Sequence, residues 1–220
     1  MNTLSLLCVS RCEPHTPRFF RHYRAVADLL GIPWVLACDR CEPPAAPAAD
    51  TVILVEAKTT IEDVLAGVHA QCETDWVLRL DDDETLTSAT LPWLVRFLRS
   101  DTTGMNAVAF PRANLWGDEA TMLVEDHMWP DTQCRLIRRD AETRDRLHQG
   151  LPADRVSPGV ILHHKFLVKS RQQREEIARL YETNGTGLGL GEHYVRYSLP
   201  EVAFGDSPKT APAPDLAGNA

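Results

Sequence analysis

The sequence predicts an α/β protein built on one mostly parallel sheet that is flanked by helices. Short apolar runs alternate along the chain with amphipathic stretches of helical length, and this order produces parallel strands with helices on both faces. The 220 residues suffice for one domain with a sizeable core. We therefore expect one domain over residues 1–197. The remaining residues, 198–220, end in a Pro/Ala-rich stretch that we expect to be a disordered tail.

The first half of the chain predicts four strands and two helices. Apolar runs bounded by turn residues indicate the strands, and Gly31 ends the first amphipathic stretch. The expected order is strand Leu4–Val9, helix Pro17–Leu30, strand Trp34–Cys38, strand Thr51–Val55, a helix from about Thr60 to Cys72, and a strand from Trp76 into Asp81.

The second half predicts further strands around a loop that carries two tryptophans. Its last helix begins with a capping box, in which Ser170 is followed three residues later by Gln173. The expected order is a helix through Trp93–Leu98, strand Ala107–Phe110, a loop with Trp116 and Trp129, strand Cys134–Arg138, strand Val160–His163, and the capped helix.

Four carboxyl groups directly follow the apolar strand that ends at Leu80, and they are Asp81, Asp82, Asp83 and Glu84. Side chains alternate along a strand, so we expect Asp81 and Asp83 to point the same way and to share one cation. Hard oxygen ligands favour Mg²⁺, Mn²⁺ or Ca²⁺ over zinc. The alternative is an acidic turn that favours the start of the next helix.

Composition excludes several classes of protein. The net charge of −8 argues against general binding to nucleic acid or to anionic membranes. No apolar segment is long enough to span a bilayer, and Leu4–Val9 is preceded by no basic region of the kind that begins a secretory signal. We therefore expect a cytoplasmic enzyme, whose oligomeric state the sequence leaves open.

Six cysteines in such a chain favour reduced thiols over a disulfide framework. The pairs Cys8/Cys12 and Cys38/Cys41 fall at the ends of two strands that would be neighbours. That spacing permits a zinc site with four thiolates without requiring one. A small buried thiol is the ordinary interpretation for Cys8.

Five further motifs form a pattern together with the acidic residues that follow Leu80. The first strand ends in Ser10-Arg11-Cys12-Glu13, the second ends at Asp39, and later the chain carries Pro130–Arg139, Leu147-His148-Gln149 and Ile161–Lys165. In order and spacing, these motifs resemble the family 2 glycosyltransferases of the GT-A fold, and in particular the compact bacterial members that act on lipopolysaccharide cores. The resemblance covers roughly residues 1–185. It implies a Rossmann-like sheet that binds a nucleoside-diphosphate sugar.

The resemblance also implies a role for each matching residue. Asp81 and Asp83 would form the Asp-x-Asp pair, with Asp83 nearer the Mn²⁺ or Mg²⁺ ion and Asp81 nearer the ribose. Asp39 would accept from the N–H of the base, and Arg11 or Glu13 would line the nucleoside pocket. His164 would be a further metal or diphosphate contact, with packing as its alternative. Lys165, Lys169 and Arg171 would help to neutralise the diphosphate, or would belong to a solvated helix start.

The catalytic base is less clearly marked. Gln149 stands where compact members often carry a glutamate, and an amide cannot take the proton of the acceptor. Glu125-Asp126 resembles the acidic pair that supplies the base in other members. We expect Asp126 to be the base, with Asp131 close behind, and either could instead be an ordinary loop acid.

Together these residues predict metal-dependent, inverting transfer of a sugar from a nucleoside-diphosphate sugar, with a UDP-sugar as the first choice. The acceptor would offer a hydroxyl or an amine, on a small molecule, a glycan or another substrate. Three alternatives remain at this point: a non-catalytic module that binds nucleotide, sugar or calcium, a nucleotidyltransferase of related fold, and a modifier of DNA bases by sugar transfer, which the acidic net charge disfavours. The second would carry a Gly-rich loop after the first strand, but residues 10–17 contain no glycine.

Overall fold

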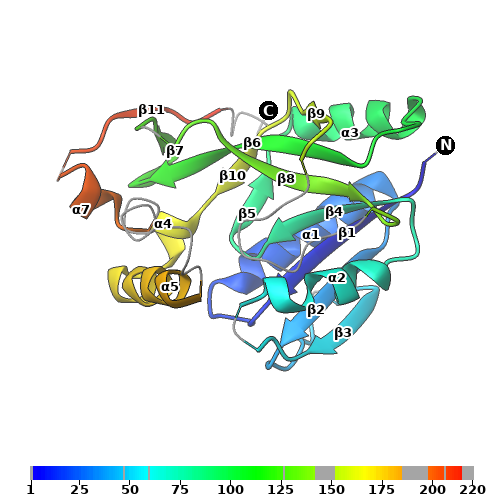
Figure 1. Cartoon of the computed structure of the whole chain (residues 1–220), viewed down its shortest axis with the longest axis horizontal. Helices are drawn as coiled ribbons and strands as arrows, with labels where there is room; N and C mark the ends of the chain where they lie inside the picture. The colour runs from blue at the N-terminus through cyan, green and yellow to red at the C-terminus, as the bar shows by residue number, and fades with distance from the viewer. Residues whose placement is uncertain are drawn as a thin grey trace.

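The computed structural model describes residues 2–46, 48–58, 60–125, 127–141, 152–184, 198–205 and 207–214. Figure 1 shows the order of its helices and strands. The first half contains β1 (Leu4–Ser10), α1 (Thr16–Leu30), β2 (Trp34–Asp39), β3 (Thr51–Val55), α2 (Glu62–Ala70), β4 (Trp76–Asp81), β5 (Glu84–Leu86) and α3 (Thr90–Arg99). The second half contains β6 (Ala107–Trp116), β7 (Asp118–Leu123), β8 (Asp131–Arg138), β9 (Arg155–Val156), β10 (Ile161–His163), α4 (Lys165–Val168), α5 (Arg171–Asn184), α7 (Pro200–Ala203) and β11 (Thr210–Pro212).

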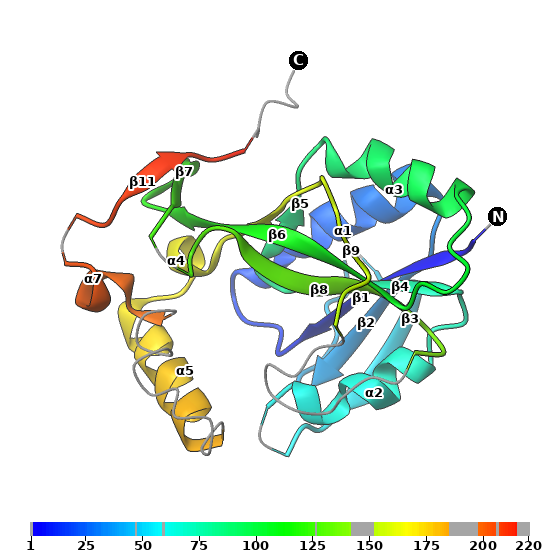
Figure 2. The ribbon, with the colours of Figure 1, turned by 45° about the horizontal axis from the view of Figure 1, so that its top comes forward.

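The first half forms the parallel part of the sheet. β1 lies between β2 and β4, and β3 pairs with the far side of β2, all in parallel. Apolar side chains of α1 and α3 pack on one face of these strands, and those of α2 pack on the other (Figure 2). Every residue of β1 and β2 is buried, as expected for strands that are covered on both faces. The predicted α/β fold class is confirmed.

The second half extends the same sheet with antiparallel strands. β8 lies between β4 and β6 and runs antiparallel to both, which gives the order β11-β7-β6-β8-β4-β1-β2-β3. β6 continues well beyond the predicted Phe110, so Trp116 ends a strand instead of lying in a loop. Neither β5 nor β7 was predicted. β5 has only three residues, and β7 begins with the exposed residues Asp118, Glu119 and Ala120, so neither shows a clear apolar pattern.

The prediction of a disordered tail is wrong for residues 198–205 and 207–214. α7 lies in this segment, and β11 pairs antiparallel with β7. Glu125 fixes the same segment, because its carboxylate accepts a hydrogen bond from the backbone N–H of Lys209 at 2.8 Å. The composition of the tail could not reveal this pairing, which depends on a strand nearly ninety residues earlier in the chain. Residues 215–220 lie outside the described part.

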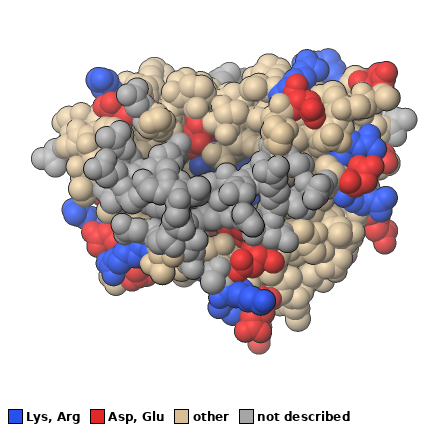
Figure 3. All heavy atoms as spheres, viewed as in Figure 1, with Lys and Arg blue, Asp and Glu red and all other residues tan. Residues whose placement is uncertain are grey.

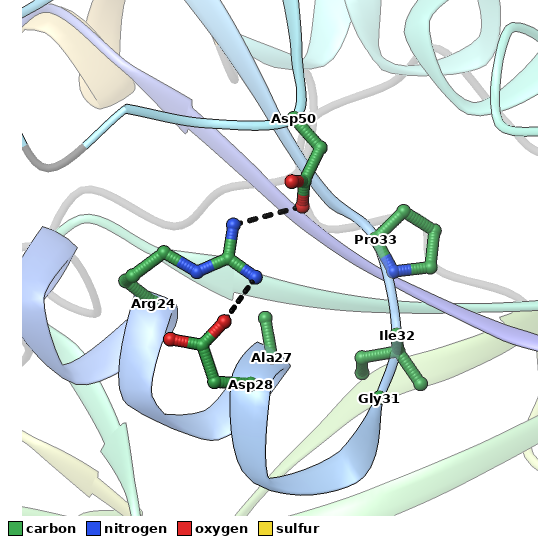
Figure 4. A pocket seen from close by; sticks show the side chains of 7 residues that line it. All are labelled: Arg24, Ala27, Asp28, Gly31, Ile32, Pro33 and Asp50. Atoms are coloured by element: carbon green, nitrogen blue, oxygen red, sulfur yellow. Dashed lines mark hydrogen bonds and ion pairs between the residues drawn. The ribbon is translucent and has the colours of Figure 1, made fainter.

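An open hollow lies at the end of α1, and the residues that line it hold α1 to the loop before β3 (Figure 4). Gly31 ends α1 in the left-handed conformation, with φ of 63°, and its N–H is directed at the last carbonyl groups of the helix. Arg24 then contacts Asp28 at 2.8 Å and Asp50 at 2.9 Å. The Asp50 carboxylate also accepts from the backbone N–H of Trp34 at 2.8 Å. These bonds join α1 to the loop before β3, so we assign the hollow no role in ligand binding.

Among the described helices, none has both the length and the apolar character that crossing a membrane requires.

Lowering the pH is expected to destabilise the fold through His69 of α2. His69 is buried, and burial, together with the nearby Arg79, lowers its pKa from 6.5 to about 4. The unfolded chain therefore binds the proton more tightly, so the stability that neutral His69 gives is complete above pH 6.5 and is lost as the pH falls toward 4. We expect a loss of about 2–3 kcal/mol in unfolding free energy between about pH 7.5 and about pH 4.5.

Urea unfolding of the native chain and of His69→Gln at both pH values measures this loss of unfolding free energy. The variant keeps a hydrogen-bond donor but has no titrating group, so the difference between the two pH dependences isolates His69 from the other histidines. Equal pH dependences would contradict the assignment.

Candidate functional site

The structure gathers the predicted donor-binding residues at one edge of the sheet. β1, β2 and β4 are parallel, so their carboxyl ends meet there, with Val9 beside Asp81 in the register. Open α/β sheets bind their ligands outside this edge. The chain after β10 packs against it, because the backbone N–H of His164 donates to the carbonyl oxygen of Asp83 at 2.8 Å.

Asp81 and Asp83 have different surroundings, contrary to expectation. β4 ends at Asp81, Asp82 and Asp83 form a turn, and Glu84 begins β5. The alternation of side chains along the strand therefore stops before Asp83. The Asp81 carboxylate contacts the guanidinium of Arg135, whereas Asp83 faces the segment after β10. Strand alternation therefore gives no reason to expect that Asp81 and Asp83 share one cation. We call the turn at Asp82 and Asp83, with its neighbours Asp81 and Glu84, the acidic turn.

Asp83 faces His163, a residue that the sequence did not select as a ligand. Asn114 uses its amide nitrogen toward the carbonyl oxygen of Met128, so its Oδ1 accepts from Nδ1 of His163 at 2.7 Å. Burial and nearby Arg112 lower the pKa of His163, which favours the neutral ring. Its Nε2 then carries a lone pair toward the Asp83 carboxylate, 3.4 Å away. Two electron-rich atoms in this arrangement require a proton or a cation between them.

Lys169 supplies a fixed positive charge beside Asp83. Its ammonium lies 2.9 Å from a carboxylate oxygen of Glu13 and 3.8 Å from Oδ2 of Asp83. Burial opposes ionisation of Asp83, but His163 in its protonated form, together with Lys169, outweighs burial and holds the pKa of Asp83 well below its usual range. Glu13, predicted to line the nucleoside pocket, is thus placed beside the acidic turn.

Asp82 lies on the same side as Glu13. Its carboxylate accepts from the Ser10 hydroxyl at 2.6 Å, and His15 lies 4.0 Å away. Burial and the neighbouring Asp83 raise the pKa of Asp82 to about 7. Asp82 therefore belongs to the site, although strand alternation had assigned it elsewhere.

A buried ion network joins the acidic residues at the end of β4 to arginines of β6 and β8. Arg135 of β8 contacts both Asp81 and Glu84, the latter at 2.7 Å. Arg112 of β6 contacts Glu84 at 3.0 Å and Asp131 at 2.6 Å. Glu84 and Arg135 are almost completely inaccessible to solvent. We call these five residues the β4–β8 ion network, since it joins the acidic turn to the antiparallel half of the sheet.

Asp39 lies at the end of β2, as predicted, but its oxygens already have partners. One accepts from the backbone N–H of Ala57 at 2.9 Å, and the other accepts from Nε of Arg11 at 2.8 Å. Arg40 contacts both oxygens. The carboxylate is fully buried, while the Arg11 side chain is 43% exposed. A ligand arriving at this end would meet Arg11 first, held in place by Asp39.

The structure does not support His164 as a metal ligand. Its Nδ1 accepts from Arg18 at 2.8 Å, and its Nε2 contacts the Thr85 hydroxyl at 2.9 Å. Burial and Arg18 lower its pKa to about 3. Adjacent residues at a strand end project in different directions, so His163 reaches Asp83 and His164 turns toward α1.

Lys165 is buried beside the C-terminal segment. Its ammonium donates to the Ser198 hydroxyl at 3.1 Å, and it lies 5.9 Å from the ring centre of Phe166. Burial lowers its pKa to about 7. Asp83 is the charge that most opposes this lowering, and Lys169, one helical turn further along, lies 3.8 Å from Oδ2 of Asp83. Lys165 was predicted to contact the diphosphate. In the structure it holds the segment that leads into α7.

Of the two predicted catalytic bases, Asp126 and Asp131, the structure describes only Asp131. Asp126 lies outside the described residues. Asp131 is buried at the start of β8, and its carboxylate accepts from Arg112 and from the Gln133 amide. Despite burial, Arg112 and Gln133 lower its pKa. A carboxylate held ionised and enclosed in this way is a poor proton acceptor, so the structure argues against Asp131 as the base.

A divalent cation fits this site through Asp83 and His163. Mg²⁺ and related ions often take one or two protein ligands and complete their shell with water and phosphate oxygens. His163 Nε2 and Asp83 Oδ1 face each other at 3.4 Å, and both atoms can serve as ligands of such an ion. The predicted set of Asp81, Asp83 and His164 does not suit it, because Asp81 contacts Arg135 and His164 contacts Arg18.

Figure 3 shows blue and red side chains interspersed around the described part of one face. Basic side chains form no continuous stripe on that part, and the sequence carries eight more acidic than basic residues. Broad binding to nucleic acid depends on such a basic surface, so this face gives no support to it.

No family model matches the sequence, and no curated protein matches it. Solved structures do resemble its fold. S. aureus TarS superposes with a TM-score of 0.50 at 12% identity, over 93% of this chain but only 44% of TarS. TarS 1–349 in complex with UDP-GlcNAc gives 0.49 at 12% identity, over 90% of this chain and 72% of that one. A CMP:2-keto-3-deoxy-manno-octonic acid synthetase with CTP gives 0.42 at 14% identity, over 63% and 75%. The chain thus shares the α/β fold of S. aureus TarS.

Proposed function

We propose that this protein is a glycosyltransferase that moves a sugar from a nucleoside-diphosphate sugar, with a UDP-sugar as the first candidate, to a hydroxyl or amine. The arrangement of Asp83, His163 and Lys169 at the carboxyl edge of β1 and β4 carries the proposal. It combines a cation-binding pair with a fixed ammonium, which suits a diphosphate. The exposed guanidinium of Arg11 lies after β1 and supports a place for the nucleoside at the neighbouring strand ends.

In this proposal the chain contributes mainly charge and position. Lys169 attracts the diphosphate and stabilises the negative charge that develops on it as the sugar leaves. Asp83 and His163 would hold Mn²⁺ or Mg²⁺, which supplies further positive charge to the leaving group. The β4–β8 ion network keeps the acidic turn in place, so the charges are positioned before the donor binds. Direct attack by the acceptor would invert the anomeric centre.

Asp126 is our candidate for the base that takes the acceptor proton. Residues on both sides of it are well held. Glu125 binds the backbone of Lys209, and the carbonyl oxygen of Met128 accepts from Asn114. This stretch follows β7, whose Glu119 lies 3.8 Å from His164. The described residues on either side of Asp126 therefore belong to the segment that follows β7, and Asp126 itself lies outside the described residues.

Nucleotide binding is expected to weaken when the contact between Asp39 and Arg11 is removed. Asp39→Asn keeps the size of the side chain but loses the ion pair that holds Arg11, so we expect UDP to bind about 10-fold more weakly or worse. Calorimetric titration with UDP measures the change. Glu42→Gln, an exposed acid in the adjoining loop, is the matched control and should keep the native affinity. Unchanged affinity in Asp39→Asn would remove this end of the site from nucleoside binding.

The function itself is tested with substrates. UDP, GDP and TDP and their sugars should raise the melting temperature, since a ligand at about a hundred times its Kd stabilises by about 2.7 kcal/mol. With an acceptor, a transferase releases nucleoside diphosphate from the donor. Release of pyrophosphate from a nucleoside triphosphate and a sugar phosphate would instead show a nucleotidyltransferase. Stabilisation without turnover across an acceptor library would favour a binding module.

A further inference from the structure

Three cysteines converge at the carboxyl ends of β1 and β2. Cys12 follows β1, Cys38 lies in β2, and Cys41 follows it. Their sulphur atoms all lie within 4.8 Å of one another, with 2.7 Å between Cys12 and Cys41 and 4.0 Å between Cys12 and Cys38. Among the described residues, these cysteines form the one group of three or more His, Cys, Asp or Glu side chains whose ligand atoms lie this close together. We call it the cysteine triad.

The backbone is bent to bring these sulphur atoms together. Cys12 and Arg40 both adopt the left-handed conformation, with φ of 54° and 57°, which residues other than glycine rarely adopt. The hydroxyl of Ser10 accepts from the N–H of Cys12 at 2.8 Å and so holds the first bend. The second bend lies between Cys38 and Cys41, whose spacing of two intervening residues is common among paired zinc ligands.

The remaining cysteines are separate from the triad. Cys8, which the sequence grouped with it, is fully buried, and its sulphur is not among those that lie within 4.8 Å of one another. Cys72 packs with α2 on one face of the sheet. Cys134 lies in β8. All six are free thiols, so convergence is a property of these three positions.

We propose that Cys12, Cys38 and Cys41 bind one Zn²⁺ ion through three thiolates, with the fourth position open to water. A Zn–S bond of about 2.3 Å places tetrahedral ligands about 3.8 Å apart. The separation of Cys12 and Cys38 already matches this value, and Cys41 reaches it by opening from Cys12 by about 1 Å through side-chain rotation. Cys12 and Cys41 are half-buried, which leaves the ion a path from solvent. Each thiol that binds releases its proton to water.

Such an ion would tie together two loops of the nucleoside end. Arg11 directly precedes Cys12, and Asp39 and Arg40 lie between Cys38 and Cys41. The ion would thus brace the contact between Arg11 and Asp39 from the protein side. A disulfide between Cys12 and Cys41 is the competing use of the same atoms, and it would leave Cys38 without a role.

Cobalt is the direct probe, because Co²⁺ bound to thiolates gives a sulphur-to-metal charge-transfer absorption. We expect the reduced full-length chain, titrated with Co²⁺ without oxygen, to develop this band up to one equivalent and to lose it when Zn²⁺ is added. Cys12→Ser and Cys41→Ser should each weaken Co²⁺ binding by more than about 10²-fold. Both sites are half-buried, and thermal melts check that the variants fold. Cys134→Ser is the matched control and should bind as the native chain does.

Three results would overturn the proposal: no band at one equivalent, the same band in Cys41→Ser, or a purified chain lighter by two hydrogens that takes up no metal after reduction. The last result would assign Cys12 and Cys41 to a disulfide. Co²⁺ binding is read without nucleotide or acceptor, so this outcome is independent of the proposed sugar transfer.

Discussion

Asp83→Asn is expected to lower the rate of sugar transfer by about 10²-fold or more. The amide keeps the shape of the side chain but removes the charge that faces His163 and Lys169. A divalent cation then loses its carboxylate ligand, and the leaving diphosphate loses part of its stabilisation, an effect that typically costs 10²–10³-fold for one preorganised group. Release of nucleoside diphosphate from the donor, measured with Mn²⁺ and with EDTA, gives the rate.

The same variant should bind the donor equally with Mn²⁺ and with EDTA, whereas the native chain should prefer Mn²⁺. Asp140→Asn is the matched control, because Asp140 is an acid that pairs with Arg138 on the surface. If the native chain binds the donor equally well in EDTA, and Asp83→Asn transfers sugar at the native rate, both the metal and the role of Asp83 must be abandoned.

Arg135→Met is expected to lower the free energy of unfolding by about 3–5 kcal/mol. Methionine fills most of the volume but leaves the buried Glu84 without one of its two arginine partners and Asp81 without its contact on β8. Removing one member of a buried ion pair leaves an uncompensated charge, which costs far more than the pair itself contributed. Urea unfolding, extrapolated to water, measures the loss.

Arg138→Met provides the control on the same strand. Arg138 pairs with the exposed Asp140, and surface ion pairs contribute about 0–1 kcal/mol. Adding Glu84→Gln to Arg135→Met should recover part of the lost stability, because it removes a buried charge. A loss below about 1 kcal/mol in Arg135→Met, equal to that in Arg138→Met, would show that the β4–β8 ion network does not stabilise the fold.

The sequence predicted the parallel half of the fold well because its strands are buried on both faces and read as continuous apolar runs. It also placed Arg11, Asp39 and the acidic motif at one sheet edge, since parallel strands share that edge. Predictions that relied on side-chain alternation along a strand were less accurate beyond the end of the strand. The turn at Asp82 and Asp83 broke the alternation that had paired Asp83 with Asp81.

Contacts between distant segments were the other source of error. Lys169 and His163 reach Asp83 from about eighty residues later in the chain, and nothing local distinguishes His163 from His164. The adjacent histidines were a signal that one of them would face the site, but only the packing of β10 selects which. Arg112 and Arg135 gave no signal either, since a buried arginine in a strand has the same sequence context as an exposed one.

The position of β8 has a consequence for how the chain is made. β4 has β1 on one side and β8 on the other, so its second neighbour is supplied by residues 131–138. Until Arg138 has left the ribosome, the nascent chain presents β4 with a row of unpaired backbone groups, which invites pairing with other chains. The parallel strands β1 to β4 thus cannot complete their pairing ahead of the rest. We expect the two halves to reach the native state together, in one late step of synthesis, and not as successive folding units.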